Sequence, residues 1–471
     1  MKRKFIMQND TICAVSTASG MGAIAIIRIS GVQAIDISDS IFSSVKKDFS
    51  LKSAKGYSVH YGNIVNDSGE VIDEVLLTLF RAPNSFTGED SVEIACHGSL
   101  FIQQEILKLL LSKGCRMATH GEFTQRAFSN GKMDLSQAEA IADLIASQSR
   151  ASHRLAMNQM RGGFSSEIVQ LRDRLLTFTS LVELELDFSD HEELEFADRT
   201  ELMDLANEIE VKIGKLKRSF GVGNAIKNGV PVSIIGETNA GKSTLLNYLL
   251  KEEKAIVSDI HGTTRDVIED TIQLNGVLFR FIDTAGLRET TDTIENLGIE
   301  RSFQMMDKAS IILWLIDSTQ PVGHLEKMIS TIAARLEGKK YMMIFNKMDQ
   351  IDESKKEMLK SYYQQFDCEK LFISAKLQEN TELLEEQLFK LVQLPEVGEN
   401  DVMVTNMRHY EVLKNAHEAI LRVIEGLEQG ISGDFLSQDI RECLHYLGEI
   451  TGEITTDEVL GNIFKKFCIG K

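Results

Sequence analysis

The segment richest in possible chemistry is a glycine-containing loop of eight residues that runs from Gly236 to Ser243. It follows the apolar run 230–235 directly and opens a stretch with helical spacing, which is the setting that a phosphate-binding loop requires. Backbone N–H groups and a helix N-terminus would surround the phosphates, Lys242 would reach the β- and γ-phosphates, and Ser243 would ligate Mg²⁺. The residues predicted to contact the nucleotide here are Asn239, Ala240, Gly241, Lys242, Ser243 and Thr244.

A second motif addresses the base of the nucleotide. Asn346, Lys347 and Asp349 come at the end of another apolar run. A carboxylate at Asp349 can accept hydrogen bonds from N1–H and the exocyclic amine of guanine, whereas adenine presents an acceptor at N1. Ser374, Ala375 and Lys376 follow the next apolar run and are predicted to form the loop behind the base. The predicted ligand is therefore GTP.

Two further segments complete the pattern of a GTP site. Residues 283–286 follow an apolar run and are predicted to contact GTP through Asp283, Thr284, Ala285 and Gly286, with Asp283 close to Mg²⁺ and Gly286 at the γ-phosphate. Residues 262–266 supply Thr264 as the predicted Mg²⁺ ligand. Leu287 stands where Ras-like GTPases carry a water-orienting glutamine, and an apolar side chain cannot orient water. The catalytic group must come from elsewhere, and the candidates are Arg265, Arg288, Glu289 and Glu295.

The elements that position these motifs change along the chain. Residues 1–131 combine strand-like runs with glycine-rich turns, which predicts a small α+β domain. Proline is absent from 84–230 and from 396–471, and apolar residues recur there at helical spacing, so we expect long helices. Between them, short apolar runs alternate with amphipathic stretches, as in a doubly wound, mostly parallel sheet. The predicted order is an α+β domain (1–131), helices (132–228), an inserted α/β domain (229–394) and helices again (395–471).

Composition limits the possible functions. The chain has 471 residues, 43% of them apolar and 26% charged, which is typical of globular proteins. Its 70 acidic and 51 basic residues give a formal charge of −19, so a nucleic acid would need a local basic patch or a partner. The six cysteines are scattered, without a C-x-x-C pair, and no apolar run is long enough to span a bilayer. These features favour a cytoplasmic protein.

With these motifs the chain resembles the MnmE (TrmE) family of tRNA wobble-uridine modification GTPases. The resemblance covers essentially all 471 residues and includes the tail 467–471, which reads Phe-Cys-Ile-Gly-Lys. Near the N-terminus, the segments 27–31, 85–90 and 121–124 are similar to the family's folate domain, and 130–139 is similar to the entry into its helical domain. The resemblance implies a folate-binding-like N-terminal domain and a Ras-like P-loop GTPase domain inserted into the helices.

The resemblance also implies a homodimer, formed through the N-terminal domains, whose G domains meet when GTP and K⁺ are bound. Asn239, Ser258, Ile260 and Thr263 would hold K⁺, with Ser258 and Thr263 also close to GTP. Glu295 matches the family's water-activating glutamate, although a helix N-terminus would favour a surface glutamate at this position without any catalysis. His261 stands where a small residue is commoner in the family, so the strength of K⁺ stimulation stays open.

In the N-terminal domain the resemblance implies a site for 5-formyl- or methylene-tetrahydrofolate, contacted by Arg28, Glu93, Lys132 and Lys471. For Arg28, Glu93 and Lys132 an ordinary surface role is the alternative. Cys468 in the tail could act as a nucleophile. Other departures from the family pattern are Thr238 for proline, residues 119–120 for an Arg-Pro pair and Ser99 for glycine.

The resemblance implies that the modification needs a flavin. No glycine motif of this chain completes a dinucleotide fingerprint, so the flavin must come from a partner. The resemblance identifies that partner as the FAD-binding MnmG protein, in a heterotetramer that presents tRNA. The implied function is a K⁺-dependent GTPase that drives addition of a (carboxymethyl)aminomethyl group at C5 of the wobble uridine. An Era- or Der-like ribosome-assembly GTPase and a folate-dependent aminomethyltransferase with a passenger G domain are the alternatives.

The guanine motif generates a direct test. In Asp349→Asn an amide replaces the carboxylate that would accept two hydrogen bonds from guanine, so the preference for GTP over XTP should fall at least tenfold. Competition between the two nucleotides for the purified protein measures the change. An unaltered preference in the variant would contradict the assignment of Asp349 to the base.

Overall fold

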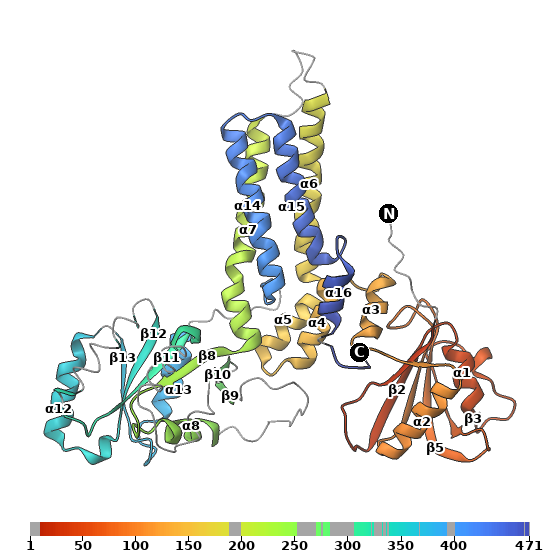
Figure 1. The fold of residues 1–471 in the computed structure, drawn as a ribbon, viewed down its shortest axis with the longest axis horizontal. Coiled ribbons are helices and arrows are strands. Elements are labelled where there is room, and N and C mark those ends of the chain that lie inside the picture. The colour runs from red at the N-terminus through yellow and green to blue at the C-terminus, as the bar shows by residue number, and fades with distance from the viewer. Residues whose placement is uncertain are drawn as a thin grey trace. The chain divides into compact units, whose positions relative to one another are not determined.

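A computed structural model of the chain describes residues 10–187, 199–251, 270–274, 277–282, 306–321, 323–324, 332, 336, 339–366, 368–392, 401–465 and 467–470. The chain divides into two compact units. The first contains residues 1–145, 159–213 and 412–471, and the second contains residues 146–158 and 214–411. Figure 1 gives the elements of both units.

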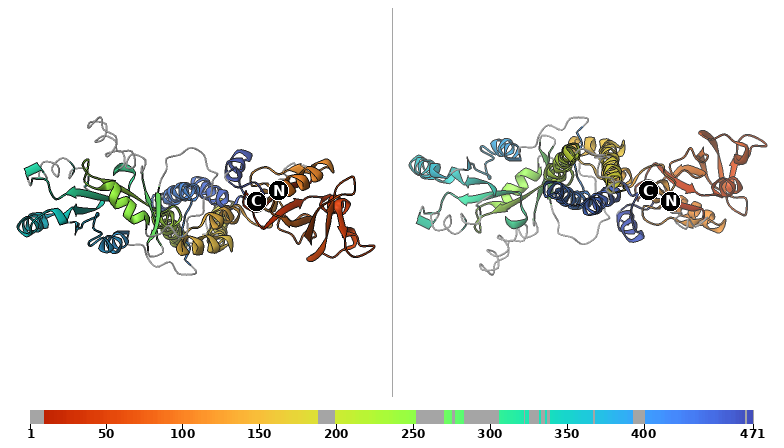
Figure 2. Two further views of the ribbon diagram at one scale, coloured as in Figure 1. Left: turned by 90° about the horizontal axis from the view of Figure 1, so that it is seen from below. Right: turned by 90° about the horizontal axis from the view of Figure 1, so that it is seen from above.

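The first unit contains a seven-stranded sheet in the order β3-β4-β5-β6-β2-β1-β7. All its pairs are antiparallel except β1 with β7. Buried and exposed residues alternate along β5, as expected for a sheet with one covered face. Helix α2 packs on the covered face, as Figure 2 shows from two sides. The elements are β1 (Ile12–Val15), β2 (Ile24–Ser30), α1 (Ala34–Ile41), β3 (Phe42–Ser44), β4 (Ser58–Val65), β5 (Val71–Phe80), β6 (Ser91–His97), α2 (Leu100–Ser112), β7 (Arg116–Met117) and α3 (Glu122–Ser129).

Long helices form the rest of the first unit, with α6 and α15 packed along each other. Their buried residues follow the helical period, for example Leu436, Ile440, Cys443 and Leu447 on α15. Helices α7 and α14 run through both units. The helices of this part are α4 (Leu135–Ala146), α6 (Gly163–Asp187), α7 (Arg199–Asn228), α14 (Met407–Glu428), α15 (Gly433–Thr451) and α16 (Asp457–Phe464). Helix α5 (Arg150–Met160) belongs mostly to the second unit.

The C-terminal tail lies against the N-terminal sheet, although the two are far apart in sequence. The Ser16 hydroxyl donates to the carbonyl of Gly470 at 3.1 Å, and Ile469 forms an isolated β-bridge with His120. Gly470 has φ of +94°, and a Cβ at this position would lie 2.2 Å from the carbonyl oxygen of Val15. Any side chain there would push the tail away from β1.

The second unit contains a six-stranded sheet in the order β13-β12-β11-β8-β10-β9. Its pairs are parallel except for the edge pair β9–β10. Strand β11 is buried along its whole length, as expected for a parallel strand covered on both faces. The elements are β8 (Val230–Ile235), α8 (Lys242–Lys251), β9 (Asp270–Leu274), β10 (Val277–Phe281), β11 (Ile311–Asp317), β12 (Lys340–Asn346), α12 (Glu353–Tyr362), β13 (Glu369–Phe372) and α13 (Glu382–Val392).

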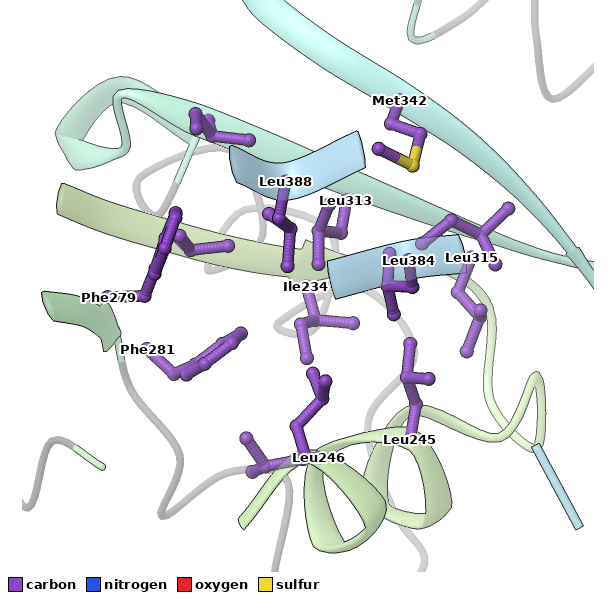
Figure 3. Packing of buried hydrophobic residues seen from close by; sticks show 14 of the residues in the cluster. Ile234, Leu245, Leu246, Phe279, Phe281, Leu313, Leu315, Met342, Leu384 and Leu388 are labelled. Atoms are coloured by element: carbon purple, nitrogen blue, oxygen red, sulfur yellow. The ribbon is translucent and has the colours of Figure 1, made fainter. Parts of the chain in front are cut away.

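The core on one face of this sheet is made by α8 and α13. Leu245 and Leu246 of α8 and Leu384 and Leu388 of α13 point toward the strand side chains, among them Ile234 (Figure 3). This packing fixes the start of α8, and therefore the loop 236–241 before it, at the carboxyl edge of β8.

The predicted fold class is confirmed: an α+β N-terminal part, helices, and a doubly wound, mostly parallel sheet between them. The predicted boundaries at 131, 228 and 394 stay predictions. The sequence does not predict strands β1, β3, β4, β7 and β9, and all of these except β4 are short or lie at an edge of their sheet. Within the described ranges, no helix is both long and apolar enough to cross a membrane.

A charge network centred on the buried Arg126 and Glu122 holds the N-terminal loops. Arg126 bonds to Asp10, Glu89 and Glu122, and Arg116 bonds to Asp10 and Glu122. Burial raises the pKa of Glu122, but hydrogen bonds from Arg116, the Thr119 N–H and Arg126 outweigh it and lower that pKa to about 2. Removal of this carboxylate would leave two arginines short of a partner.

We expect Glu122→Gln to destabilise the N-terminal domain by about 3 kcal/mol at neutral pH. The folded-state pKa lies below the ordinary 4.5, so the stabilisation is complete above that value and is lost as the pH falls toward 2. Urea unfolding of the variant and the wild type at several pH values measures it, with the exposed Glu74→Gln as control. A difference that stayed constant down to pH 2 would contradict this account.

Candidate functional site

The loop 236–241 has the backbone geometry of a phosphate cradle. Asn239 and Gly241 adopt positive φ, and α8 begins at Lys242. Lys242 Nζ donates to the carbonyls of Gly236 and Glu237, at 2.8 and 2.7 Å. Burial lowers the pKa of Lys242, against the raising effect of the Glu237 charge. The ammonium is therefore held inside the loop, where it can meet phosphate oxygens.

The buried amide of Asn346 joins three loops of this site. Its Nδ2 donates to the carbonyl of Ala240 at 2.8 Å, and its Oδ1 accepts from the N–H of Ala375 at 2.9 Å. A Cβ on Gly241 would lie 2.3 Å from the same Nδ2, so only glycine allows the loop to approach so closely. Asn346, Ala240 and Ala375 are all at least 97% buried. The phosphate loop and the 374–376 loop are thus fixed relative to each other.

The residues that follow Asn346 include those predicted to contact the guanine base. Lys347 has φ of +63° and its Nζ contacts Asp317 Oδ2 at 2.6 Å. Burial opposes the ionisation of Asp317, but the hydrogen bonds from Lys347 and Thr319 prevail and hold its pKa below the ordinary value. Asp349 is exposed in a short turn, with the N–H of Met348 bonded to the carbonyl of Ile373. Its carboxylate is free to accept from a ligand.

The structure thus brings together several of the residues predicted to contact GTP. Ser243 is half-buried and Thr244 is exposed at the start of α8, Ser374 is buried, and Lys376 is exposed. The pair Asp317–Lys347 was not anticipated, and an aspartate directly after a buried apolar strand is the signal that could have indicated it. The predicted positions that lie outside the described residues are Ser258, Ile260, Thr263, Thr264, Asp283, Thr284, Ala285, Gly286 and Glu295.

Two of the residues predicted to contact the folate, Arg28 and Glu93, lie on the N-terminal sheet. Arg28 on β2 is directly opposite Glu93 on β6, and Arg28 Nε and Nη2 both lie 2.9 Å from Glu93 Oε1. The Arg28 guanidinium lies 5.3 Å from the Phe86 ring centre and 5.7 Å from that of Phe123. Two aromatic faces and a carboxylate therefore hold Arg28, while both charged side chains remain partly exposed.

The remaining predicted residues are arranged around the same sheet. Lys132 Nζ donates to the carbonyl of Pro83 at 2.9 Å, beside the loop that contains Phe86. Cys468 is exposed, and its carbonyl accepts from the N–H of Gly121. Lys471 lies outside the described residues. The tail and the Arg28–Glu93 pair thus meet at one sheet, since Ala14 of β1 is opposite Arg28 and Gly470 contacts the end of β1.

A parallel sheet whose carboxyl edge carries a phosphate loop and a guanine-type motif defines a P-loop GTP-binding protein. Two family descriptions match the sequence: the GTP-binding protein TrmE N-terminus over residues 11–132 and the MnmE helical domain over residues 135–468. The chain belongs to the MnmE family of tRNA modification GTPases. This confirms the predicted family and the prediction that the chain is a GTPase.

Curated relatives agree over the full length. The tRNA modification GTPase MnmE of Bacteroides thetaiotaomicron is 59% identical over 468 residues, covering 99% of this chain and 100% of the relative. The protein of the same name from Flavobacterium johnsoniae is 50% identical over 470 residues, with the same coverage. A solved structure of Era with MgGDPNP and a ribosomal RNA fragment aligns at 25% identity and a TM-score of 0.27, over 40% of this chain and 66% of that chain, which is too weak to bear on fold or function.

The role of Asn346 can be tested by two substitutions. Asn346→Ala leaves both Ala240 O and Ala375 N–H without a partner, whereas Asn346→Asp keeps the acceptor for Ala375 and faces Ala240 O with a second acceptor. Each unsatisfied buried group costs about 1–3 kcal/mol, so we expect GDP affinity to fall at least tenfold in both variants. Titration with a fluorescent GDP analogue measures the loss, with Asn247→Ala, at an exposed helical position of α8, as control. Affinities within twofold of the wild type would contradict this role.

Proposed function

We propose that this chain is a K⁺-dependent GTPase that acts with an FAD-binding MnmG-type partner to add a (carboxymethyl)aminomethyl group at C5 of the wobble uridine of certain tRNAs. A one-carbon tetrahydrofolate supplies the carbon. The observation that carries the proposal is the coexistence, in one chain of the MnmE family, of the Asn346-linked nucleotide loops and the Arg28–Glu93 pair beside the Cys468 tail.

The nucleotide half of the proposal assigns roles to the loops at the carboxyl edge of the second sheet. Lys242, fixed in the phosphate loop, would meet the β- and γ-phosphates, and Asp349 would accept from guanine. Ser243 and Thr264 would ligate Mg²⁺, and Asn239, Ser258, Ile260 and Thr263 would hold K⁺. Glu295 would orient the attacking water.

The folate half of the proposal rests on the chemistry of the groups at the N-terminal sheet. A folate carries a planar pteridine and carboxylates, and Arg28, Glu93, Phe86 and Lys132 offer a cation, a carboxylate, a ring and an amine to such a molecule. Cys468 and Lys471 would approach it from the tail. The thiol of Cys468 is exposed, so a substrate can reach it.

A homodimer through the N-terminal domains is part of the proposal. Exposed apolar side chains stand on the outer face of the sheet, including Val59 and the cross-strand pair Tyr61–Leu76. Such a row is unusual for a face turned to water and is suited to a second copy of the chain. The net charge of −19 supports a partner that supplies the main tRNA contacts.

Mass spectrometry of tRNA nucleosides tests the function. Deletion of the gene should abolish 5-aminomethyl-type wobble uridines, and the wild-type gene should restore them. Cys468→Ser should fail to restore them if the thiol takes part in the chemistry, whereas Cys368→Ser, a half-buried cysteine of the second unit, should restore them.

GTP hydrolysis by the same purified proteins provides the control. Cys468→Ser should hydrolyse GTP at the wild-type rate, and all active proteins should hydrolyse it faster in KCl than in NaCl. Unchanged nucleosides in the deletion strain would remove the modification role and leave a GTPase whose target has to be sought elsewhere.

A further inference from the structure

An aspartate–histidine pair at the end of β6 has no part in the sites described above. His97 Nδ1 lies 2.7 Å from Asp73 Oδ1, and the backbone N–H of His97 donates to Asp73 Oδ2 at 2.8 Å. The Asp73 side chain is 7% exposed, whereas that of His97 is 68% exposed. Because a carboxylate only accepts, Nδ1 carries the hydrogen, so in the neutral ring the lone pair is on Nε2.

The surroundings of this pair are apolar and open. The residues opposite or next to His97 along the chain include Ile24, Leu100 and Phe101, which are 66%, 49% and 68% exposed. Segments 16–23 and 98–104 contain no charged residue. Glu74, next to Asp73 on β5, is bonded to the Tyr61 hydroxyl. Within the described part of the chain, Asp73 is the carboxylate bonded to His97, and Glu74 is a second carboxylate nearby, because the β5–β6 register continued from Leu76–Ala95 places it opposite His97.

The buried Asp73 carboxylate does not need an imidazole to complete its hydrogen bonds. The His97 N–H already donates to one oxygen, and a serine or asparagine side chain could donate to the other. The adjacent thiol of Cys96 is no competitor for protons near neutral pH, because burial first and the Asp73 charge second raise its pKa to about 11. What the histidine adds is an exposed base with a fixed orientation.

The pair lies on the strand that carries Glu93. Residues 93, 95 and 97 alternate with the buried positions of β6, and four residues of strand span about 13 Å. The loop 16–22 connects the two regions, because Ser16 is bonded to Gly470 of the tail at one end and Gly22 is bonded to Gly98 at the other. His97 therefore lies at the end of the strand that carries Glu93, and the loop 16–22 runs from the tail contact at Ser16 to this end of the strand.

We propose that His97 is a catalytic base of the N-terminal domain, positioned by Asp73, for the amine that takes up the one-carbon unit. This inference rests on the proposed function, since that function requires an amine nucleophile. An alkylamine or ammonia is protonated at neutral pH and cannot attack until it loses a proton. The proton passes from the ammonium nitrogen to His97 Nε2, leaving a neutral amine and an imidazolium that Asp73 stabilises. The exposed ring then returns the proton to water.

The test uses a substitution that separates the base from the hydrogen bond. In His97→Asn the amide NH₂ takes the place of Nδ1 and keeps the bond to Asp73, but no basic nitrogen remains. Modification of tRNA by the full-length protein with its partner, assayed with ammonium as the amine from pH 5.5 to 8.5, should fall about 100-fold in this variant. The part of the pH dependence of the rate that is due to His97 should also disappear between pH 5.5 and 8.5. His445→Asn, which changes another exposed histidine beside a carboxylate, should behave as the wild type.

A second measurement does not depend on activity. The ¹H–¹⁵N NMR signals of the His97 ring, identified by their loss in His97→Asn, should show the Nδ1–H tautomer at a pH where the ring is neutral. In Asp73→Asn this tautomer preference should weaken.

Three results are decisive. A wild-type rate and pH profile in His97→Asn would overturn the inference while the proposed function stands, and so would an Nε2–H tautomer in the wild type. If the wild type itself modifies no tRNA, the proposed function fails, and the role of His97 as a base in it fails as well.

Discussion

The nucleotide loops of this protein depend on one buried amide, that of Asn346. Its two hydrogen bonds join the end of β12 to the phosphate loop and to the loop after β13. Because a buried polar group without a partner is costly, the three loops have a single arrangement in which donor and acceptor are both satisfied. The close approach of Gly241 to Asn346 follows from that arrangement, while Lys242 is held by the carbonyls of Gly236 and Glu237 in the same loop. In the proposed site, guanine recognition and phosphate binding would therefore have a common physical basis.

In the N-terminal domain, buried charged groups join separate segments in the same way that the Asn346 amide joins the loops. Arg126 is nearly buried and satisfies carboxylates from three separate segments, Asp10, Glu89 and Glu122. This network holds the loop of Phe86 and the start of α3, where Phe123 lies, and these two rings flank Arg28. A buried network of this kind costs desolvation, but it leaves little freedom to the residues that it joins. The exposed groups of the sheet thus stand on a rigid support.

Much of the candidate nucleotide site could be located from the sequence because its motifs are local. The phosphate loop needs eight consecutive residues between a strand and a helix, and Asn346, Lys347 and Asp349 lie within four residues of one another. The part that Asn346 plays in joining loops could not be predicted, because its partners Ala240 and Ala375 offer only backbone atoms, which every residue has. The pairs Asp317–Lys347 and Asp73–His97 were missed for a related reason: their members lie 30 and 24 residues apart, and no spacing rule connects them.

The sequence alone determined the class of the inserted domain, the guanine motif, the alternation of strands and helices, and the resemblance to the MnmE family. Each of these depends on residue types over short spans, where steric and hydrogen-bonding preferences act directly on neighbours. Only the tertiary structure decided that Gly470 contacts Ser16, which is 454 residues away, and that Arg28 faces Glu93 across two strands. Such contacts result from the packing of whole elements, since strand register and the burial of a tail depend on the summed interactions of residues that are distant in sequence.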